Sequence, residues 1–307
     1  MKVAILGATS QIAKDLIVSF AKQTNHECTL FARDPNIVIE WLKKIKIQQP
    51  YKALNYSYFN TEHHYDVIIN FVGVGDPAQA KKMGSQIFDV TYRYDMMALD
   101  YLKVHPETKY IFLSSGAVYG GDFAQAVTNE SVAIIPINHL NSSNGYAVAK
   151  LYAEARHRAL PELSIIDIRV FNYFSHTQNM DARFFITDMI RAIKNKDIFL
   201  TMPDNIVRDF LVPEDFFNMI KVIFKQKFIN NAVDCYTKSP IDKHSLLAEM
   251  KTKYSLKYEI SSETAVVNST GNKINYFSKN RMAGGLGYNP KNTSLSGLMK
   301  EIALIGL

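Results

Sequence analysis

Short apolar runs recur through the first half of the chain, and stretches with helical periodicity separate them. The apolar runs, which we expect to form strands, are Lys2 to Leu6, Cys28 to Ala32, Ala53 to Phe59, Val67 to Val72, Tyr110 to Leu113 and Ser164 to Val170. The stretches that we expect to form helices are Gln11 to Gln23, Met83 to Leu102 and Ala147 to Leu160. Strands that alternate with helices predict an α/β fold with a doubly wound parallel sheet.

This alternation becomes less regular after about Asn172. The expected helices there are Arg183 to Lys194, Pro213 to Phe228 and Lys243 to Lys253, and the expected short strands are Phe199 to Thr201 and Lys257 to Ile260. We therefore expect residues 1–172 to form the main domain. Residues 173–307 should form mainly a smaller, mixed α/β capping domain, with segments that can return to the main sheet.

The charge of the chain bears on its partners. The formal net charge of +6 could indicate a nucleic-acid partner, but no basic run is longer than pairs such as Lys43-Lys44 and Lys81-Lys82. We therefore expect no nucleic-acid binding. A cleft that attracts a small molecule carrying a diphosphate explains the positive charge better.

The cysteine content and the first residues of the sequence indicate the cellular compartment in which we expect the protein. Cys28 and Cys235 are the two cysteines, and no Cys/His pair has metal-ligand spacing, so we expect a reducing cytoplasm and no metal site. The first expected strand begins at Lys2, which leaves no room for a signal segment. No apolar run approaches the ~18 residues that span a bilayer, so we expect a soluble protein without a membrane span.

Residues 7–13, Gly-Ala-Thr-Ser-Gln-Ile-Ala, join the first expected strand to the first expected helix. A glycine at position 7 allows a tight turn, and the small Ser10 and Ala13 let the backbone approach a pyrophosphate at the helix N-terminus. This pattern predicts a Rossmann-like dinucleotide site formed by Gly7, Thr9, Ser10, Gln11 and Ile12. The alternative is an ordinary turn between a strand and a helix.

The second expected strand ends in Ala32-Arg33, where an acidic residue would bind a ribose 2′-hydroxyl. A small residue followed by arginine favours a 2′-phosphate, and therefore NADP(H) over NAD(H), although NAD(H) stays an alternative. Asp34 argues against this interpretation, because its charge opposes that of Arg33. The other alternative for Arg33 is a solvated loop charge.

Asn70-Phe71-Val72-Gly73 ends the fourth expected strand. Small and turn-forming residues at a strand end let the backbone pass the adenosine side of a dinucleotide, so we expect Phe71, Val72 and Gly73 to contact the cofactor. The alternative is a buried strand that runs into an ordinary turn.

Tyr146 and Lys150 are four residues apart, so their side chains share one face of an expected helix. A nearby ammonium and a positively charged nicotinamide lower the pKa of a phenol, which lets Tyr146 give or take a proton at an alcohol or carbonyl oxygen. Ser115, after the strand Tyr110 to Leu113, could hydrogen-bond the same oxygen. The alternatives are a chance Tyr/Lys pair and a turn at Ser114-Ser115 that only ends the strand.

Together these fragments resemble the extended short-chain dehydrogenase/reductases, the NAD(P)-dependent nucleotide-sugar epimerase/dehydratase family. Gly7, Ser10 and Ala13 match the cofactor turn of this family with its second and third glycines replaced. The resemblance covers nearly the whole chain, including Leu286-Gly287-Tyr288-Asn289-Pro290 near its end. It implies that residues 1–172 bind NAD(P) and that residues 173–307 mainly bind substrate.

The resemblance also implies roles for individual residues. Ser115, Tyr146 and Lys150 match the catalytic serine, tyrosine and lysine of the family. Asn172 and Arg208 match an asparagine that touches a nucleotide-diphosphate sugar and an arginine that grips its diphosphate. The family also implies a homodimer formed through the helices near 83–102 and 147–160, and a place in the biosynthesis of cell-surface polysaccharides.

Two departures from the family narrow the reaction. Members that remove water from the sugar carry an Asp-Glu pair where this chain has Gly116 and Ala117, so a 4,6-dehydratase is disfavoured. Our first hypothesis is an NADP(H)-dependent reductase of a nucleotide-linked 4-keto-6-deoxy sugar. The alternatives are a nucleotide-sugar 4-epimerase with tightly held NAD(P) and a non-catalytic NADP-binding regulator. The other departure is Tyr173-Phe174-Ser175-His176, which replaces the usual Tyr-Gly after the asparagine.

Overall fold

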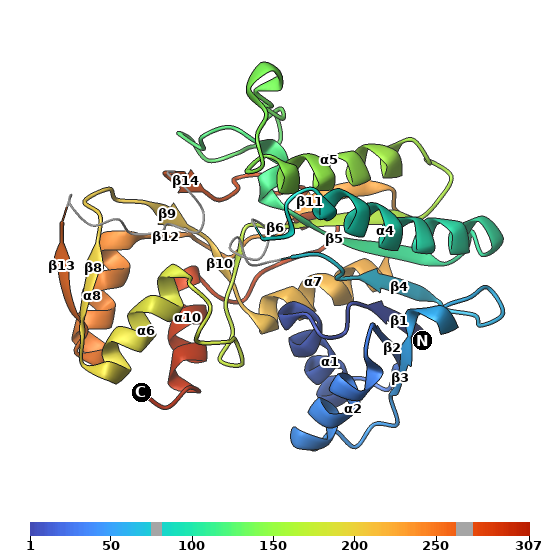
Figure 1. The fold of residues 1–307 in the computed structure, drawn as a ribbon, viewed down its shortest axis with the longest axis horizontal. Helices are drawn as coiled ribbons and strands as arrows, with labels where there is room; N and C mark the ends of the chain where they lie inside the picture. The colour runs from blue at the N-terminus through green and yellow to red at the C-terminus, as the bar shows by residue number, and fades with distance from the viewer. Residues whose placement is uncertain (75–81, 262–272) are drawn as a thin grey trace.

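A computed structural model describes residues 1–74, 82–261 and 273–307 (Figure 1). Its centre is a seven-stranded parallel sheet in the order β11-β6-β5-β4-β1-β2-β3. These strands are β1 (Lys2–Leu6), β2 (Glu27–Ala32), β3 (Lys52–Asn55), β4 (Val67–Asn70), β5 (Lys109–Ser115), β6 (Ile165–Val170) and β11 (Asn231–Asp234). The chain order runs outward from β1 in both directions, which confirms the predicted doubly wound, Rossmann-like sheet.

Helices cover both faces of this sheet (Figure 1). One face carries α1 (Gln11–Gln23), α2 (Pro35–Lys44) and α7 (Pro213–Lys225), and the other carries α4 (Gln86–Val104) and α5 (Gly145–Arg158). Val3 and Ile5 of β1 belong to the core under α1 and α7, whereas Ala4 and Leu6 belong to the core under α4 and α5. Burial on both faces explains why β1 is a continuous apolar run rather than an alternating one.

Three details differ from the expected elements. The run Ala53 to Phe59 is not one strand, because Asn55 accepts a hydrogen bond from the Ser57 backbone amide and the chain turns into the 3-10 helix η1 (Tyr56–Tyr58). The fourth strand ends at Asn70, whose side chain accepts from the Val72 amide. Helix α2, which the sequence analysis did not predict, begins with the Asp34 cap followed by Pro35.

A second core lies beside the main sheet. Helices α6 (Phe185–Asn195), α8 (Lys243–Tyr254) and α10 (Ser294–Ala303) share it through buried residues such as Met189, Leu247 and Leu298. Short elements surround it or connect it to the main sheet: β7 (Asn172–Tyr173), β8 (Ile198–Thr201), β9 (Val207–Arg208), β10 (Phe210–Leu211), β12 (Ile241–Asp242), β13 (Lys257–Ile260), β14 (Asn275–Tyr276) and α9 (Met282–Gly285). Helix α7 and strand β11 follow residue 172 in the sequence but belong to the main sheet and its layers.

Across the part of the chain that the structure describes, no helix combines the length and the apolarity needed to cross a membrane.

Candidate cofactor and active site

The turn between β1 and α1 requires glycine at position 7. Gly7 has φ +81°, and a Cβ there would lie 2.9 Å from the carbonyl carbon of Phe71 and from the amide nitrogen of Val72. Ser10 then caps α1 by accepting a hydrogen bond from the Ala13 amide at 3.3 Å. The first N–H groups of a helix have no intrahelical acceptors, so this N-terminus can bind an anion.

Gln11 and its neighbours contribute to this site in different ways. The Gln11 side chain points to the loop after β7, where its Nε2 donates to Ser175 Oγ at 3.0 Å and also hydrogen-bonds Thr177. Thr9 is exposed, and Ile12 packs partly buried against the core under α1. At positions 11 and 12 the backbone amides are therefore the groups placed to meet a pyrophosphate.

Arg33 is exposed at the carboxyl end of β2. Its backbone carbonyl accepts a hydrogen bond from Asn55 Nδ2 at 2.6 Å, which ties the ends of β2 and β3 together. The Asp34 carboxylate accepts from the Asn36 amide at 3.0 Å as the cap of α2. The acidic neighbour of Arg33 thus has a structural role at the start of a helix.

The end of β4 brings the expected adenosine side close to the expected catalytic lysine. Phe71 is buried and Val72 is partly buried. Gly73 has φ +155°, and a Cβ on it would lie 3.4 Å from Lys150 Nζ. Residues 75–81, which follow, lie outside the described residues.

Ser115 and Tyr146 meet at the carboxyl edge of the sheet. Ser115 ends β5 and caps the 3-10 helix η2 (Gly116–Tyr119) by accepting from the Ala117 amide at 3.2 Å. Tyr146 is the second residue of α5, and its phenol lies near enough to the Ser115 side chain to affect its ionisation. Burial raises the pKa of Tyr146, while the nearby Ser115 hydroxyl lowers it in part. Tyr146 therefore needs an added positive charge to act as a base near neutral pH.

Lys150 lies one turn further along α5 and is buried. Its Nζ donates to the Leu113 carbonyl at 2.7 Å and lies 4.2 Å from the centre of the Phe112 ring. Burial lowers the pKa of Lys150 to about 8, although the charges of Asp95, Asp167 and Glu154 raise it in part. The structure thus anchors Lys150 to β5 two residues before Ser115, on the helix that carries Tyr146.

Tyr276 links the expected catalytic residues to the expected substrate residues. Its hydroxyl lies 3.4 Å from Ser115 Oγ, its carbonyl accepts from Asn172 Nδ2 at 3.4 Å, and its ring lies 5.9 Å from the Arg208 guanidinium. Tyr276 is buried, and burial raises the pKa of its phenol. The sequence analysis missed this residue, because no local motif marks it and only the tertiary fold brings it to Ser115.

Two cations, Arg208 and Lys273, pack against Tyr276. Lys273 Nζ lies 4.5 Å from the Tyr276 ring and 4.9 Å from the Phe123 ring. Burial lowers the pKa of Arg208 to about 10, and burial together with the charge of Arg208 lowers the pKa of Lys273 to about 8. A bound anion between these groups would favour their charged forms, so the pair suits a diphosphate.

Gly116, the residue after Ser115, lies against an aromatic ring. A Cβ at this position would lie 2.4 Å from two ring carbons of Phe171. Phe171 is itself buried in a cluster that also contains Tyr119 and Phe123. The described residues around position 116 therefore leave no space for a side chain larger than that of glycine.

A network of buried ionic side chains connects α5 to strand β6 and helix α4. His157 Nδ1 lies 2.6 Å from Asp167 of β6, and its Nε2 lies 2.8 Å from Asp95 of α4. Burial alone would lower the pKa of His157, but the two carboxylates raise it to about 9. At neutral pH this histidine is therefore a buried cation that ties α5 to its neighbours.

A second cluster of hydrogen-bonded ionic side chains lies closer to Ser115 in the fold. Arg169 of β6 binds Glu154 of α5 through Nε and Nη2, and its Nη1 donates to Tyr119 Oη at 2.8 Å. The same glutamate accepts from Ser114 Oγ at 2.6 Å. These bonds fix the direction of β5 where it delivers Ser115.

Three solved structures illustrate what this fold resembles. The UDP-glucuronic acid 4-epimerase of Bacillus cereus in complex with NAD has a TM-score of 0.76 at 15% identity, covering 99% of this chain and 98% of that one. The UDP-glucose 4-epimerase of Bifidobacterium longum in complex with NAD⁺ and UDP has a TM-score of 0.77 at 16% sequence identity. The match covers 98% of this chain and 97% of that one. The dTDP-glucose 4,6-dehydratase of Bacillus anthracis str. Ames in complex with NAD has a TM-score of 0.75 at 17% sequence identity. The match covers 99% of this chain and 96% of that one.

These likenesses, all at low identity, show the fold that the chain shares with nucleotide-sugar enzymes. A search of the curated proteins found no match. The sequence profile of the family described as "NAD dependent epimerase/dehydratase family" matches residues 3–233, which is most of the chain. The protein is therefore an enzyme that belongs to the NAD dependent epimerase/dehydratase family.

Proposed function

We propose that this protein is a nucleotide-sugar 4-epimerase that uses NAD. The observation that carries the proposal is the placement of Ser115, at the end of β5, and Tyr146, in the first turn of α5, at the carboxyl edge of the sheet, with Lys150 one helical turn away. Gly116 and Ala117 offer no carboxylic acid to protonate a leaving hydroxyl, which favours epimerisation over dehydration.

In this proposal Tyr146 takes the proton from the sugar hydroxyl and later returns it to the same oxygen. Ser115 hydrogen-bonds that oxygen, and the Lys150 ammonium stabilises the phenolate of Tyr146. NAD, when bound, supplies a carbon that accepts a hydride and gives it back. The proton and the hydride both return, so the reaction changes only the configuration of the sugar carbon.

We assign the cofactor to the main domain, residues 1–172. Gly7 lets the backbone turn without a clash, and the amides of Gln11 and Ile12 would face the cofactor pyrophosphate at the start of α1. Thr9, Ser10, Phe71, Val72 and Gly73 complete the proposed contacts from the same edge of the sheet.

We assign a nucleotide-diphosphate sugar as the substrate and residues 173–307 mainly to its binding. Arg208 and Lys273 would hold the diphosphate, since a buried and a partly buried cation lie against one aromatic ring. Asn172, which hydrogen-bonds the Tyr276 carbonyl, would contact the sugar side. A UDP-sugar is the first candidate, because a Bacillus cereus 4-epimerase of this fold binds UDP-glucuronic acid and NAD.

A second candidate function is the NADPH-dependent reduction of a nucleotide-linked 4-keto-6-deoxy sugar. The observation that favours it is Arg33, exposed after Ala32 at the carboxyl end of β2, where a 2′-phosphate would lie. Tyr146 would then donate its proton once, to the oxygen of the reduced carbonyl.

One experiment separates the two candidates. The purified protein is incubated with a panel of nucleotide-linked sugars and keto sugars, with NAD or NADPH, and the products are identified by mass spectrometry and NMR. The epimerase proposal expects sugar conversion with no net change in cofactor absorbance. Oxidation of NADPH in equal amount to the product would establish the reductase, and no turnover with intact cofactor binding would indicate a regulator.

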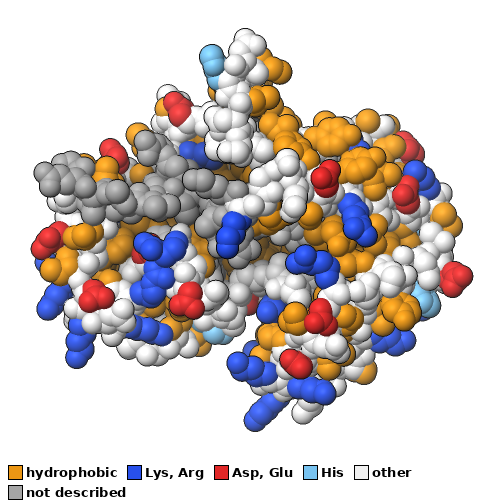
Figure 2. Space-filling model, viewed as in Figure 1, with side chains coloured by type: hydrophobic (Ala, Val, Ile, Leu, Met, Phe, Trp, Pro, Cys, Tyr) orange, Lys and Arg blue, Asp and Glu red, His pale blue; other side chains and the backbone are white. Residues whose placement is uncertain are grey.

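We also propose that the protein forms a homodimer through α4 and α5. Figure 2 shows hydrophobic side chains gathered over these helices, and Phe88, Tyr92 and Tyr152 are exposed there. Arg156 lies 4.8 Å from the Tyr92 ring and 5.5 Å from the Tyr152 ring. Sedimentation should give the mass of a dimer, and Tyr152→Glu should shift it to that of a monomer.

A cytoplasmic location completes the proposal. Cys28 and Cys235 are free and buried, so neither forms a disulfide within the chain. Cell fractionation with an antibody should find the protein with the soluble cytoplasmic enzymes, and recovery from an exported fraction would contradict this location.

A further inference from the structure

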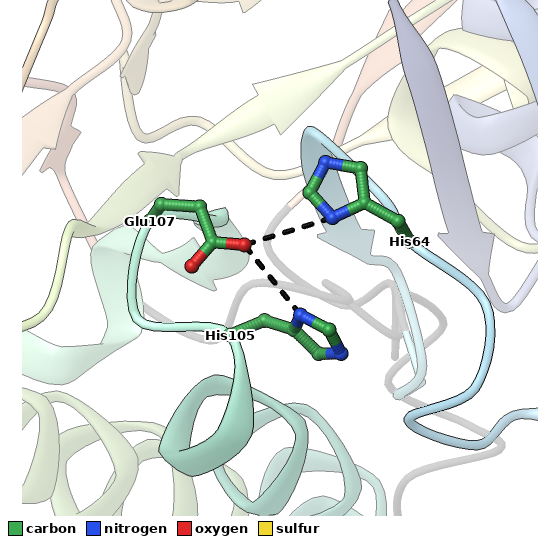
Figure 3. A group of neighbouring side chains, drawn as sticks. All are labelled: His64, His105 and Glu107. Carbon is green, nitrogen blue, oxygen red and sulfur yellow. Dashed lines mark ion pairs between the residues drawn. The ribbon is translucent and has the colours of Figure 1, made fainter.

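Three potential metal ligands meet at the edge of the sheet opposite the catalytic residues (Figure 3). His64 lies just before β4, His105 directly follows α4, and Glu107 lies just before β5. Glu107 Oε1 is 3.6 Å from His64 Nδ1 and 3.5 Å from His105 Nδ1. Each residue offers a ligand atom within 4.8 Å of the others.

These separations are longer than those of good N–H···O hydrogen bonds, which lie at about 2.7 to 3.2 Å. They agree better with the spacing of atoms that share a metal ion. In a tetrahedral zinc site with bonds of about 2.0 to 2.1 Å, neighbouring ligand atoms are about 3.3 Å apart. The two distances from Glu107 are therefore close to this spacing, and all three ligand atoms lie within 4.8 Å of one another.

The far nitrogen of the His105 ring has a partner that leaves its Nδ1 available for a metal. His105 Nε2 lies 2.8 Å from the Thr61 carbonyl, which can only accept, so Nε2 carries the proton and Nδ1 presents a lone pair. His64 Nε2 faces Asp66 Oδ1 at 3.5 Å. Metal-binding histidines commonly donate their other N–H to a carbonyl or a carboxylate in this way.

One buried tyrosine holds both histidines in place. The Tyr101 ring stacks on the His105 ring with centroids 4.5 Å apart. The Tyr101 hydroxyl donates to the His63 carbonyl at 2.8 Å and accepts from the Tyr65 amide at 2.9 Å, which fixes the segment that carries His64. The C-terminus of α4, where His105 is the capping residue, adds a negative partial charge that favours a cation.

We infer that His64, His105 and Glu107 form a binding site for Zn²⁺ or a similar late first-row divalent cation. Two imidazoles and one carboxylate are the donors these ions prefer, whereas Mg²⁺ and Ca²⁺ prefer oxygen ligands alone. The site lies at the amino ends of β4 and β5, so the ion stabilises this edge of the fold and takes no part in the chemistry at Ser115 and Tyr146. The sequence analysis expected no metal site because no Cys/His pair has metal-ligand spacing.

The test is calorimetric titration of the tag-free full chain with Zn²⁺, and with Mg²⁺ for comparison. We expect one Zn²⁺ per chain, no Mg²⁺ binding, and a rise in the unfolding temperature on adding Zn²⁺. His105→Ala and Glu107→Gln should each weaken Zn²⁺ binding by at least about tenfold. The matched control is His139→Ala, because His139 is an exposed histidine outside this cluster.

Cobalt gives an independent readout of the ligands. Co²⁺ bound by His64, His105 and Glu107 should show the visible absorption of a low-symmetry, four-coordinate ion, and His64→Gln should abolish it. The side chains of His64 and Glu107 are 47% and 58% exposed, so these variants should fold, which circular dichroism verifies. Equal Zn²⁺ affinity in His105→Ala and His139→Ala, or no Zn²⁺ binding by the unaltered chain, would overturn the inference.

Discussion

The two faces of the central sheet differ in what they bury. Both have an apolar core, but the face under α4 and α5 also contains ions that hydrogen-bond one another, such as His157 with Asp95 and Asp167. Aromatic rings pack in both cores. Under α1 and α7 they include Phe20 and Phe217, in edge contact at 6.0 Å between centroids, and we call this side the aromatic face because the described residues form no buried ion pair there.

This difference follows the position of the proposed catalytic residues. Helix α5 carries Tyr146 and Lys150, and it lies on the face with the buried ions. Hydrogen-bonded ions fix the direction of a side chain, whereas apolar contacts are not directional. We infer that the ionic face orients the reacting groups and that the aromatic face mainly supplies stability.

The largest expected effect is on catalysis at the ionic face. Tyr146→Phe removes the hydroxyl that gives and takes the proton, so it should lower turnover by about 10²- to 10⁴-fold with nearly unchanged affinity for the cofactor. Steady-state kinetics and cofactor titration measure both quantities. Tyr92→Phe on the neighbouring helix is the matched control and should keep its activity. Unaltered turnover in Tyr146→Phe would remove the catalytic assignment.

On the aromatic face the expected effect is on stability alone. Phe20→Ala leaves a cavity in a fully buried site and should lower the free energy of unfolding by about 3 to 5 kcal/mol. Urea unfolding measures this change, and Phe228→Ala, at a residue that is 56% exposed, should change it by less than about 0.5 kcal/mol. A large loss of turnover per folded Phe20→Ala molecule would contradict the proposed division of roles.

The dependence of stability on pH should distinguish the two faces further. The pKa of His157 is raised in the folded protein, so its contribution is complete below the unfolded pKa near 6.5 and is lost as the pH rises through about 9. His157→Gln should therefore lower the free energy of unfolding most below about pH 6.5 and less as the pH approaches 9. Its stability should depend less on pH than that of the unaltered protein. Phe20→Ala should keep the profile of the unaltered protein, and equal flattening in both variants would refute the assignment to His157.

The smallest expected effect concerns the cofactor at the end of β2. If Arg33 contacts a 2′-phosphate, Arg33→Ala should weaken NADPH binding by about tenfold and leave NADH binding nearly unchanged. Fluorescence titration with each cofactor measures the two affinities. Equal losses for both cofactors would eliminate the 2′-phosphate contact and favour NAD.

Much of the main sheet could be predicted because its signals are local. A buried parallel strand such as β1 is an uninterrupted apolar run, and Gly7 marks the turn that follows it. The positions of Ser115 and Tyr146 after a strand and at a helix start likewise place both at one edge of the sheet.

The remaining parts depend on contacts between distant segments. Tyr276 reaches Ser115 across 161 residues, and no pattern around either residue signals the contact. His64 and His105 come together only because β4 and β5 are neighbours in the sheet. Strand β11 pairs with β6 after a long excursion of the chain through the smaller core, which local periodicity cannot reveal.

The contact between Gly116 and Phe171 limits how this enzyme can evolve. An acidic residue at position 116 would bring its Cβ to 2.4 Å from two ring carbons of Phe171. The Phe171 ring would have to move or be replaced by a smaller side chain before the acidic residue could fit. A change at position 116 therefore requires a second change at position 171. A larger residue at position 116 is therefore expected to be accepted only together with a smaller residue at position 171.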